Sequence, residues 1–365
     1  MTAPQYQVLF SAADGAYHTY RIPALVVSAT GAVLAFCEGR RDSARDAGEI
    51  DLLLRRSQDG GQTFGPQVVV ATQPGWTCGN PAPLLDEHTG TLWLLFCKNR
   101  ADGDENLICQ GKAPRLVWQT HSLDDGATWS VPIEITPDVK PQQWSWYATG
   151  PGHGIQLRSG RLLVPCDHVV LRDGNRGDPH HSHVVYSDDH GATWQVGGTV
   201  DEGTNESTAA ETADGWLHLN CRNARRDQDG NAFRAVAWSR DGGMTFSPVV
   251  RDTALPEPVC QASVLHYPAR SADGAAVMVF SNPAATDGTA RGRNHLTLRL
   301  SFDAGQTWPG ATVLWPGPAA YSDLCRTTDG TLCCLFEHGD QEPYERITLA
   351  RLDMAVLTAA ARRPS

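Results

Sequence analysis

Short runs of apolar and β-branched residues recur along the chain, separated by polar segments rich in Gly, Asp and Ser. Runs of this length, bounded by turn-forming residues, are typical of β-strands and too short for most helices. The pattern therefore predicts an all-β protein with strands in these runs: Tyr6–Phe10, Pro23–Val27, Val33–Phe36, Leu92–Phe96, Leu116–Trp118, Leu162–Val164, Val184–Tyr186, Leu217–Leu219, Ala235–Trp238, Val277–Phe280, Leu296–Leu298, Thr331–Phe336 and Ile347–Leu352.

An eight-residue segment of the form S-x-D-x-G-x-T-(W/F) occurs five times between the predicted strands, starting at Ser57, Ser122, Ser187, Ser239 and Ser301. Asp bonds its own backbone and Gly adopts a positive φ at little cost, so each segment is expected to form a hairpin turn. Successive serines are 65, 65, 52 and 62 residues apart, enough for one four-stranded sheet. This repetition predicts a β-propeller, with each turn before the last strand of its blade and serving folding, not catalysis.

The two ends of the chain are predicted to share one blade. After Trp308, only Ala319–Asp353 has strand character, which is too short for a full blade. Because Tyr6–Phe10 lies outside the first blade, it can supply the missing strand and remove an exposed sheet edge. We therefore expect a six-bladed β-propeller, with the repeated turn in five blades and the N-terminal strand closing the last. Residues 1–365 would form this single domain, with a short C-terminal tail at about 354–365.

Charge and composition exclude several classes of partner. The formal net charge of −11 argues against nucleic acid and anionic membranes, which bind net basic faces. Lysine is nearly absent, so almost every basic residue is an arginine. Only its position in the sequence can therefore mark an arginine as one that binds an anionic ligand. The sequence carries no cofactor motif, and no oligomer is predicted. In the run His180–His183 we favour a solvated loop over a metal site, because no carboxylate or cysteine nearby has ligand spacing.

The N-terminal residues and the cysteines indicate the compartment. Met1–Gln7 lacks both the basic and the apolar region of a signal peptide, so the sequence as given predicts a cytoplasmic protein. The ten cysteines are scattered and form no C-x-x-C pair. We therefore expect buried, reduced thiols and no zinc knuckle.

Two unrepeated segments are candidates for chemistry. Arg21 lies in Tyr20–Pro23, immediately before a predicted strand, where a merely solvated charge is a poor explanation. Asp46 lies in a loop close to Gly48, so its carboxylate is free to project. Together with the five turns, the Tyr-Arg-Ile-Pro segment resembles the exo-α-sialidase (neuraminidase) family, in which the repeated turns are the Asp boxes or BNR repeats. The resemblance extends from Tyr20 to about Leu352.

The resemblance implies three arginines that bind a substrate carboxylate. They correspond to Arg21, to Arg222 at the end of Leu219–Asn223, and to Arg293 ahead of the fifth box. Arg299 competes with Arg293, but it lies only two residues from that box. Planar guanidinium groups suit this task because they bind a carboxylate through paired, charge-assisted hydrogen bonds.

The resemblance also implies the reacting groups of a retaining glycosidase. Tyr321, in Ala320–Leu324, corresponds to the nucleophile; a phenol avoids the repulsion that a carboxylate would meet at a carbon already bearing one. Glu206 corresponds to its base, with Glu211 as the alternative carboxylate. Asp46 corresponds to the general acid and base, a group that works best with a raised pKa.

Further residues have supporting counterparts in the family. Glu337 corresponds to the carboxylate that orients the first arginine. Arg40 corresponds to an arginine that contacts the sugar, with Arg41 as the alternative. Asn80–Pro81 and Asp167–His168 occupy loops comparable to those that recognise the acyl group and the glycerol tail, but their roles are not legible from the sequence.

The expected substrates are sialylated oligosaccharides, glycoproteins or gangliosides, hydrolysed through a tyrosyl-enzyme intermediate. Three alternatives stay open: hydrolysis or transfer of a variant nonulosonic acid such as deaminated neuraminic acid, transfer in place of hydrolysis, and a glycan-binding propeller without catalysis. The last would be expected to have lost Tyr321, Glu206 or Asp46, and all three are present. A glycosidase for neutral sugars would need no arginine cluster.

Overall fold

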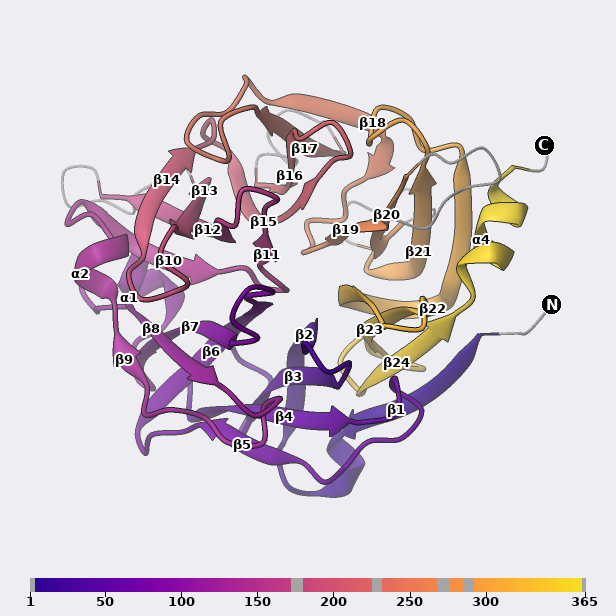
Figure 1. Cartoon of the computed structure of the whole chain (residues 1–365). Coiled ribbons are helices and arrows are strands. Elements are labelled where there is room, and N and C mark those ends of the chain that lie inside the picture. The colour runs from indigo at the N-terminus through magenta and orange to yellow at the C-terminus, as the bar shows by residue number, and fades with distance from the viewer. Residues whose placement is uncertain (1–3, 172–179, 225–231, 268–275, 285–291, 363–365) are drawn as a thin grey trace.

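A computed structural model describes residues 4–171, 180–224, 232–267, 276–284 and 292–362. The protein is all-β, as the sequence predicts, and every predicted strand run overlaps an observed strand. Figure 1 shows the sheets arranged radially around a common centre, which gives a propeller-like fold. Within the described residues, no helix has the length and apolar character needed to cross a membrane.

The N-terminal part of the chain forms an eight-stranded sheet in which β5 pairs only with β4. Its strands are β2 (Thr19–Val27), β3 (Val33–Arg40), β4 (Ile50–Ser57), β5 (Val68–Ala71), β6 (Trp76–Leu85), β7 (Leu92–Arg100), β8 (Leu116–Ser122) and β9 (Ile133–Glu134). The following five-stranded sheet contains β10 (Trp144–Thr149), β11 (Ile155–Gln156), β12 (Leu162–Val170), β13 (His180–Ser187) and β14 (Gln195–Thr199).

A four-stranded sheet and a seven-stranded sheet complete the fold. The first contains β15 (Thr204–Glu211), β16 (Leu217–Asn223), β17 (Phe233–Ser239) and β18 (Val250–Pro256). The second contains β1 (Gln5–Ser11), β19 (Ser263–Tyr267), β20 (Val277–Pro283), β21 (Asn294–Ser301), β22 (Gly310–Arg326), β23 (Leu332–His338) and β24 (Arg346–Leu352). The described helices are short: η1 (Ala12–Asp14), α1 (Glu105–Cys109), α2 (Thr136–Val139) and α4 (Met354–Ala361).

The two ends of the chain meet in the seven-stranded sheet. β1 pairs antiparallel with β24, from Gln5 opposite Arg351 to Ser11 opposite Arg346. This is the pairing predicted for the N-terminal run. In place of the expected tail, α4 packs on β22 with Met354 and Leu357 buried; residues 363–365 lie outside the described residues.

Each repeated segment begins at the last residue of a strand, and its side chains fold back on the turn. In the second copy, Ser122 Oγ donates to Asp124 Oδ1 at 2.8 Å and accepts from the Gly126 amide at 2.8 Å. Asp124 also accepts from the amide and hydroxyl of Thr128 at 2.9 and 2.6 Å. Asp125 and Gly126 both have positive φ, 56° and 75°, and two such residues in succession match the twist of a tight hairpin.

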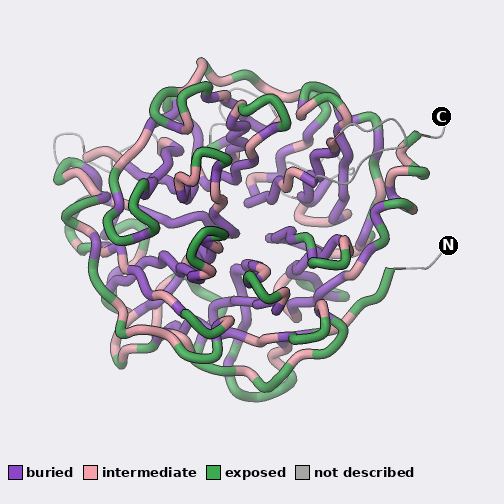
Figure 2. The backbone as a smooth tube through the Cα atoms, in the orientation of Figure 1, coloured by how far each residue is buried: buried purple, intermediate pink, exposed green. Residues whose placement is uncertain are grey.

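Apolar side chains fill the space between neighbouring sheets. One cluster joins Leu25 and Leu53 of the first sheet to Leu335 and Leu349 of the last. Figure 2 shows buried residues along the strands and exposed residues mainly in the peripheral segments and connecting loops. All ten cysteines are buried, as predicted, and no disulfide joins the described residues. The strand ends near the common centre of the sheets are therefore available to form a site.

Candidate active site

A cavity of about 350 Å³ gathers residues from all four sheets. Its size falls within the range of small-molecule sites. The residues lining it include most of those singled out in the sequence, namely Arg21, Arg40, Asp46, Glu206, Arg222, Arg293 and Tyr321. No residue of the five repeated turns lines it.

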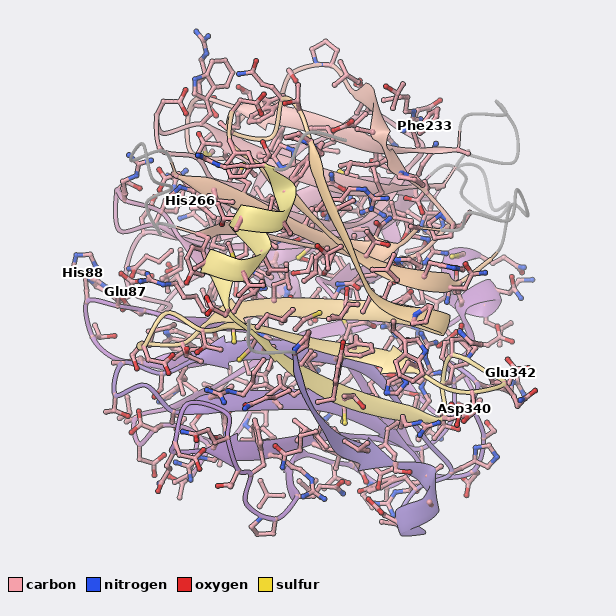
Figure 3. The ribbon with its side chains drawn as sticks, turned by 90° about the vertical axis from the view of Figure 1, so that its right-hand side faces the viewer. Glu87, His88, Phe233, His266, Asp340 and Glu342 are labelled. Carbon is pink, nitrogen blue, oxygen red and sulfur yellow. The ribbon has the colours of Figure 1, made fainter. Side chains whose placement is uncertain are left out.

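The cavity and the repeated turns lie toward opposite rims. Figure 3 shows Asp340 and Glu342 on one rim and Glu87, His88 and His266 on the other. Asp340 and Glu342 share a turn with Tyr344, which lines the cavity. His190 of the third repeated turn lies against His88, with ring centroids 5.8 Å apart.

Arg21 is held by a carboxylate that lies behind the cavity wall. Glu337 is fully buried; its Oε1 accepts from Arg21 Nε at 3.0 Å and from the Ile22 amide at 2.8 Å. Its Oε2 accepts from Arg21 Nη2 at 3.2 Å and from the Tyr321 amide at 3.0 Å. Ile22 has φ 60° at a register shift in β2, a strained conformation for a β-branched residue. Glu337 thus fixes Arg21 and Tyr321 together.

Tyr321, Glu206 and Arg222 form a connected group. The Tyr321 hydroxyl donates to Glu206 Oε1 at 2.5 Å, and Arg222 Nη1 donates to Glu206 Oε2 at 2.7 Å and to the phenol oxygen at 3.2 Å. Burial and the Glu206 charge raise the pKa of Tyr321 well above its usual value, against the opposing effect of three arginines. The phenol is therefore protonated at neutral pH, with a carboxylate in place to accept its proton. Glu211, the alternative base, lies outside this cavity and contacts Arg158.

Arg293, the third of the arginines predicted to bind the carboxylate, also lines the cavity. Its Nη1 donates to Tyr344 Oη at 2.8 Å and its Nη2 to the Val259 carbonyl at 2.7 Å. The competing candidate, Arg299, lies in β21 outside the cavity lining and donates to Asn282 Oδ1 at 3.1 Å. Position in the fold thus separates two arginines that the sequence leaves in competition.

Asp46 lies at the mouth of the cavity beside two arginines. Its Oδ1 is 2.7 Å from Arg40 Nη2 and 3.7 Å from Arg21 Nη1. The Asp46 side chain keeps 67% of its surface exposed, so it is only partly buried. Partial burial raises the pKa of this carboxyl group, but the positive charges of Arg40 and Arg21 lower it by more, and the pKa lies below its usual value. The expected raised pKa is therefore absent in the free protein. Arg41 instead contacts Asp51, away from the cavity.

The cavity lining also contains residues that the sequence analysis did not single out. Arg115 lies 4.3 Å from the Trp146 ring centroid and bonds to Asn80 and to the Tyr147 carbonyl. Trp146 Nε1 donates to Asp167 Oδ2 at 3.0 Å. Asn80 and Asp167 both line the cavity, but they lie in β6 and β12 and not in loops. No sequence motif marks Arg115 or Trp146.

The histidine run differs from the expectation. His180 and His183 lie in β13, and His183 is fully buried, so the predicted solvated loop is wrong. The run also lies near groups that its sequence spacing does not reveal: ligand atoms of Glu105, Cys109 and His180 lie within 4.8 Å of one another. His180 Nδ1 lies 2.8 Å from Asn205 Nδ2, so that ring nitrogen already has a partner in the cavity wall.

Comparison with known proteins gives one consistent result. The chain is similar to a sialidase of Micromonospora viridifaciens, 36% identical over 362 residues that cover 92% of this chain and 52% of the relative. It is similar to an exo-α-sialidase of Aspergillus fumigatus, 33% identical over 353 residues that cover 88% and 79%. Among solved structures, the Hadza microbial sialidase Hz136 has a TM-score of 0.82 at 31% identity, covering 95% of this chain and 68% of that chain.

The chain thus spans about half the length of the Micromonospora relative. The family model for the BNR repeat-like domain matches residues 31–334, which is most of the sequence. With this model matched and the Aspergillus relative covered over most of its length, the chain belongs to the exo-α-sialidase family of BNR-repeat proteins.

Proposed function

We propose that this protein is a retaining exo-α-sialidase that hydrolyses terminal sialic acid α-glycosides of oligosaccharides, glycoproteins or gangliosides. One observation carries the proposal: three arginines from distant parts of the chain line one cavity with a phenol that bonds to a carboxylate. A sialic acid bears its carboxylate on the anomeric carbon, so its site needs cations and a nucleophile side by side. The cavity supplies both within a chain of net charge −11.

In the first step, Arg21, Arg222 and Arg293 bind the carboxylate and bring the anomeric carbon to Tyr321. Arg222 and Arg293 both line the cavity, so an incoming anion can reach their guanidinium groups. The phenol oxygen forms a bond to the anomeric carbon while Glu206 takes its proton and the glycosidic bond breaks. The product of this step is a tyrosyl-enzyme, with the aglycone oxygen protonated by Asp46.

In the second step, Asp46 takes a proton from water, whose oxygen bonds to the anomeric carbon and displaces the phenolate. Glu206 then returns its proton to the phenolate, which restores Tyr321. The low pKa of Asp46 in the free protein follows from Arg40 and Arg21. A substrate carboxylate bound to Arg21 offsets that positive charge, and the aglycone covers the exposed face of Asp46. Both changes raise its pKa, so substrate binding itself prepares the general acid.

Transfer to a sugar acceptor is the second candidate function. A covalent intermediate can react with a hydroxyl group in place of water, and the exposed Asp46 at the cavity mouth leaves space for either acceptor.

We also propose that residues 1–365 form one six-bladed propeller. Support comes from β22, whose first part pairs with β21 and whose second part pairs with β23. The seven-stranded sheet then divides into two blades at this strand, and β1 closes the last of them. The eight-stranded sheet divides in the same way between β4 and β6, which meet through a single parallel residue pair.

A release assay tests the proposed activity. The protein is incubated with fluorogenic α-glycosides of N-acetyl-, N-glycolyl- and deaminated neuraminic acid, with a neutral β-galactoside as control. We expect release from at least one acidic sugar and none from the galactoside. Proton NMR of the first product distinguishes the α anomer, expected for retention, from the β anomer. Absence of release from all three acidic sugars would overturn the proposed function.

A further inference from the structure

Tyr344 contacts Arg21 and Arg293, two of the three arginines predicted to bind the carboxylate, although no sequence motif marks it. Its Oη accepts from Arg293 Nη1 at 2.8 Å, and its ring centroid lies 4.2 Å from the Arg21 guanidinium carbon. The Tyr321 ring lies 4.9 Å from the same carbon. Arg21 therefore contacts two aromatic rings, and one of them also holds Arg293.

The three arginines differ in the charge of their partners. Arg21 pairs with Glu337 and Arg222 pairs with Glu206. Among the described residues, the hydrogen-bond partners of Arg293 are neutral oxygens: the Tyr344 hydroxyl and the Val259 carbonyl. Arg293 is thus oriented from both sides without being neutralised, so its full charge is available to a bound anion.

The turn that carries Tyr344 is held by its own hydrogen bonds. Glu345 accepts from the backbone amides of Asp340, Gln341 and Glu342 at 3.2, 2.8 and 2.9 Å. These bonds place the turn on the rim where Figure 3 shows Asp340 and Glu342. A fixed turn means that the Tyr344 hydroxyl is presented to Arg293 before any ligand binds, which reduces the cost of ordering the site.

We propose that Tyr344 is a positioning residue for carboxylate recognition, which aligns Arg293 through its hydroxyl and Arg21 through its ring while leaving the charge of Arg293 free for the substrate. This inference rests on the proposed function. It separates the two roles of Tyr344, because phenylalanine keeps the ring and removes only the hydroxyl.

Three variants test the role of Tyr344. Tyr344→Phe is expected to raise KM about tenfold and to change kcat by less than about twofold, because the lost bond to a charged group acts equally on bound substrate and transition state. Tyr344→Leu should raise KM several-fold further, since Arg21 also loses its aromatic contact. Glu342→Gln, on the same turn, is the matched control and should leave both constants unchanged.

A ligand pair distinguishes positioning from a merely structural role. Binding of the 2,3-unsaturated analogue of N-acetylneuraminic acid and of its C1 methyl ester, which lacks the charge, is measured by calorimetry. Tyr344→Phe should weaken the acid about tenfold and leave the ester unchanged. Equal weakening of both, or an unchanged KM, would overturn the proposal. A wild-type protein that binds the acid but releases no sugar would refute the proposed activity alone, whereas one that does not bind the acid would refute both.

Discussion

The substitution Glu337→Gln tests the link between stability and the site. Glu337 is fully buried and accepts four hydrogen bonds, two of them from Arg21. The glutamine carbonyl can replace one carboxylate oxygen, but its amide group would face two donors on the other side. The substitution therefore leaves the buried Arg21 without its counter-ion and at least two donors without an acceptor.

The expected cost follows from these contacts. Removing one partner of a buried ion pair costs about 3–5 kcal/mol, a large part of the total stability of an ordinary protein. For a chain of this size, we expect the Tm to fall by about 4–7 °C. Activity should fall as well, because the carboxylate also holds the Tyr321 amide.

The assay is urea unfolding at pH 7, followed by tryptophan fluorescence, together with thermal unfolding by circular dichroism. Glu342→Gln is the control, because it makes the same chemical change at an exposed position. A loss of less than about 1 kcal/mol for Glu337→Gln, relative to this control, would refute the reasoning and show that Arg21 finds another acceptor.

Three further predictions concern catalysis and acid stability. Tyr321→Phe should lower kcat by orders of magnitude with an unchanged far-UV spectrum; retained turnover would exclude the phenol as nucleophile. Arg40→Ala should raise the pKa of Asp46, so the alkaline limb of kcat/KM, which follows loss of the acidic proton, should move to higher pH. The pKa of Asp124 is lowered to about 2, mainly by Thr128, so its stabilisation is present above pH 4 and lost toward pH 2. Asp124→Asn should therefore lower the Tm at pH 7. The Tm of this variant should also fall less steeply than that of the wild type between pH 4 and pH 2.

Local sequence signals were sufficient for strands such as β3, β7 and β12, but not for edge strands such as β9 and β18. The strand runs and the repeated turns depend on residues close together in the chain, such as Ser122, Asp124 and Gly126. Among the strands that contribute to the cavity, β2 was predicted, whereas β6 was missed because it lacks an apolar pattern: Trp76–Leu85 contains Gly79, Asn80 and two prolines. These strands line the cavity, where polar groups and register shifts replace regular alternation.

The site was predicted only where a motif marked it. Arg21, Glu206 and Tyr321 stand in segments that resemble a known family, and the structure brings them to one cavity. Tyr344 and Arg115 stand in no such segment, and their contacts depend on how distant strands pack. The position of the histidine run was predicted wrongly because polar residues were taken to indicate a loop, whereas His183 lies buried against Tyr147 and Trp144.

The pairing of β1 with β24 has a consequence for biosynthesis. Arg21 is synthesised before Glu337, which balances its charge, and β1 is synthesised before its partner β24; both partners come more than 300 residues later. Until then, this guanidinium has no built anion partner, and the nascent chain exposes an unpaired strand edge. A truncated translation product ending before β23 would therefore lack both the β1–β24 pairing and the Glu337 carboxylate behind the cavity wall, and would be a target for chaperones.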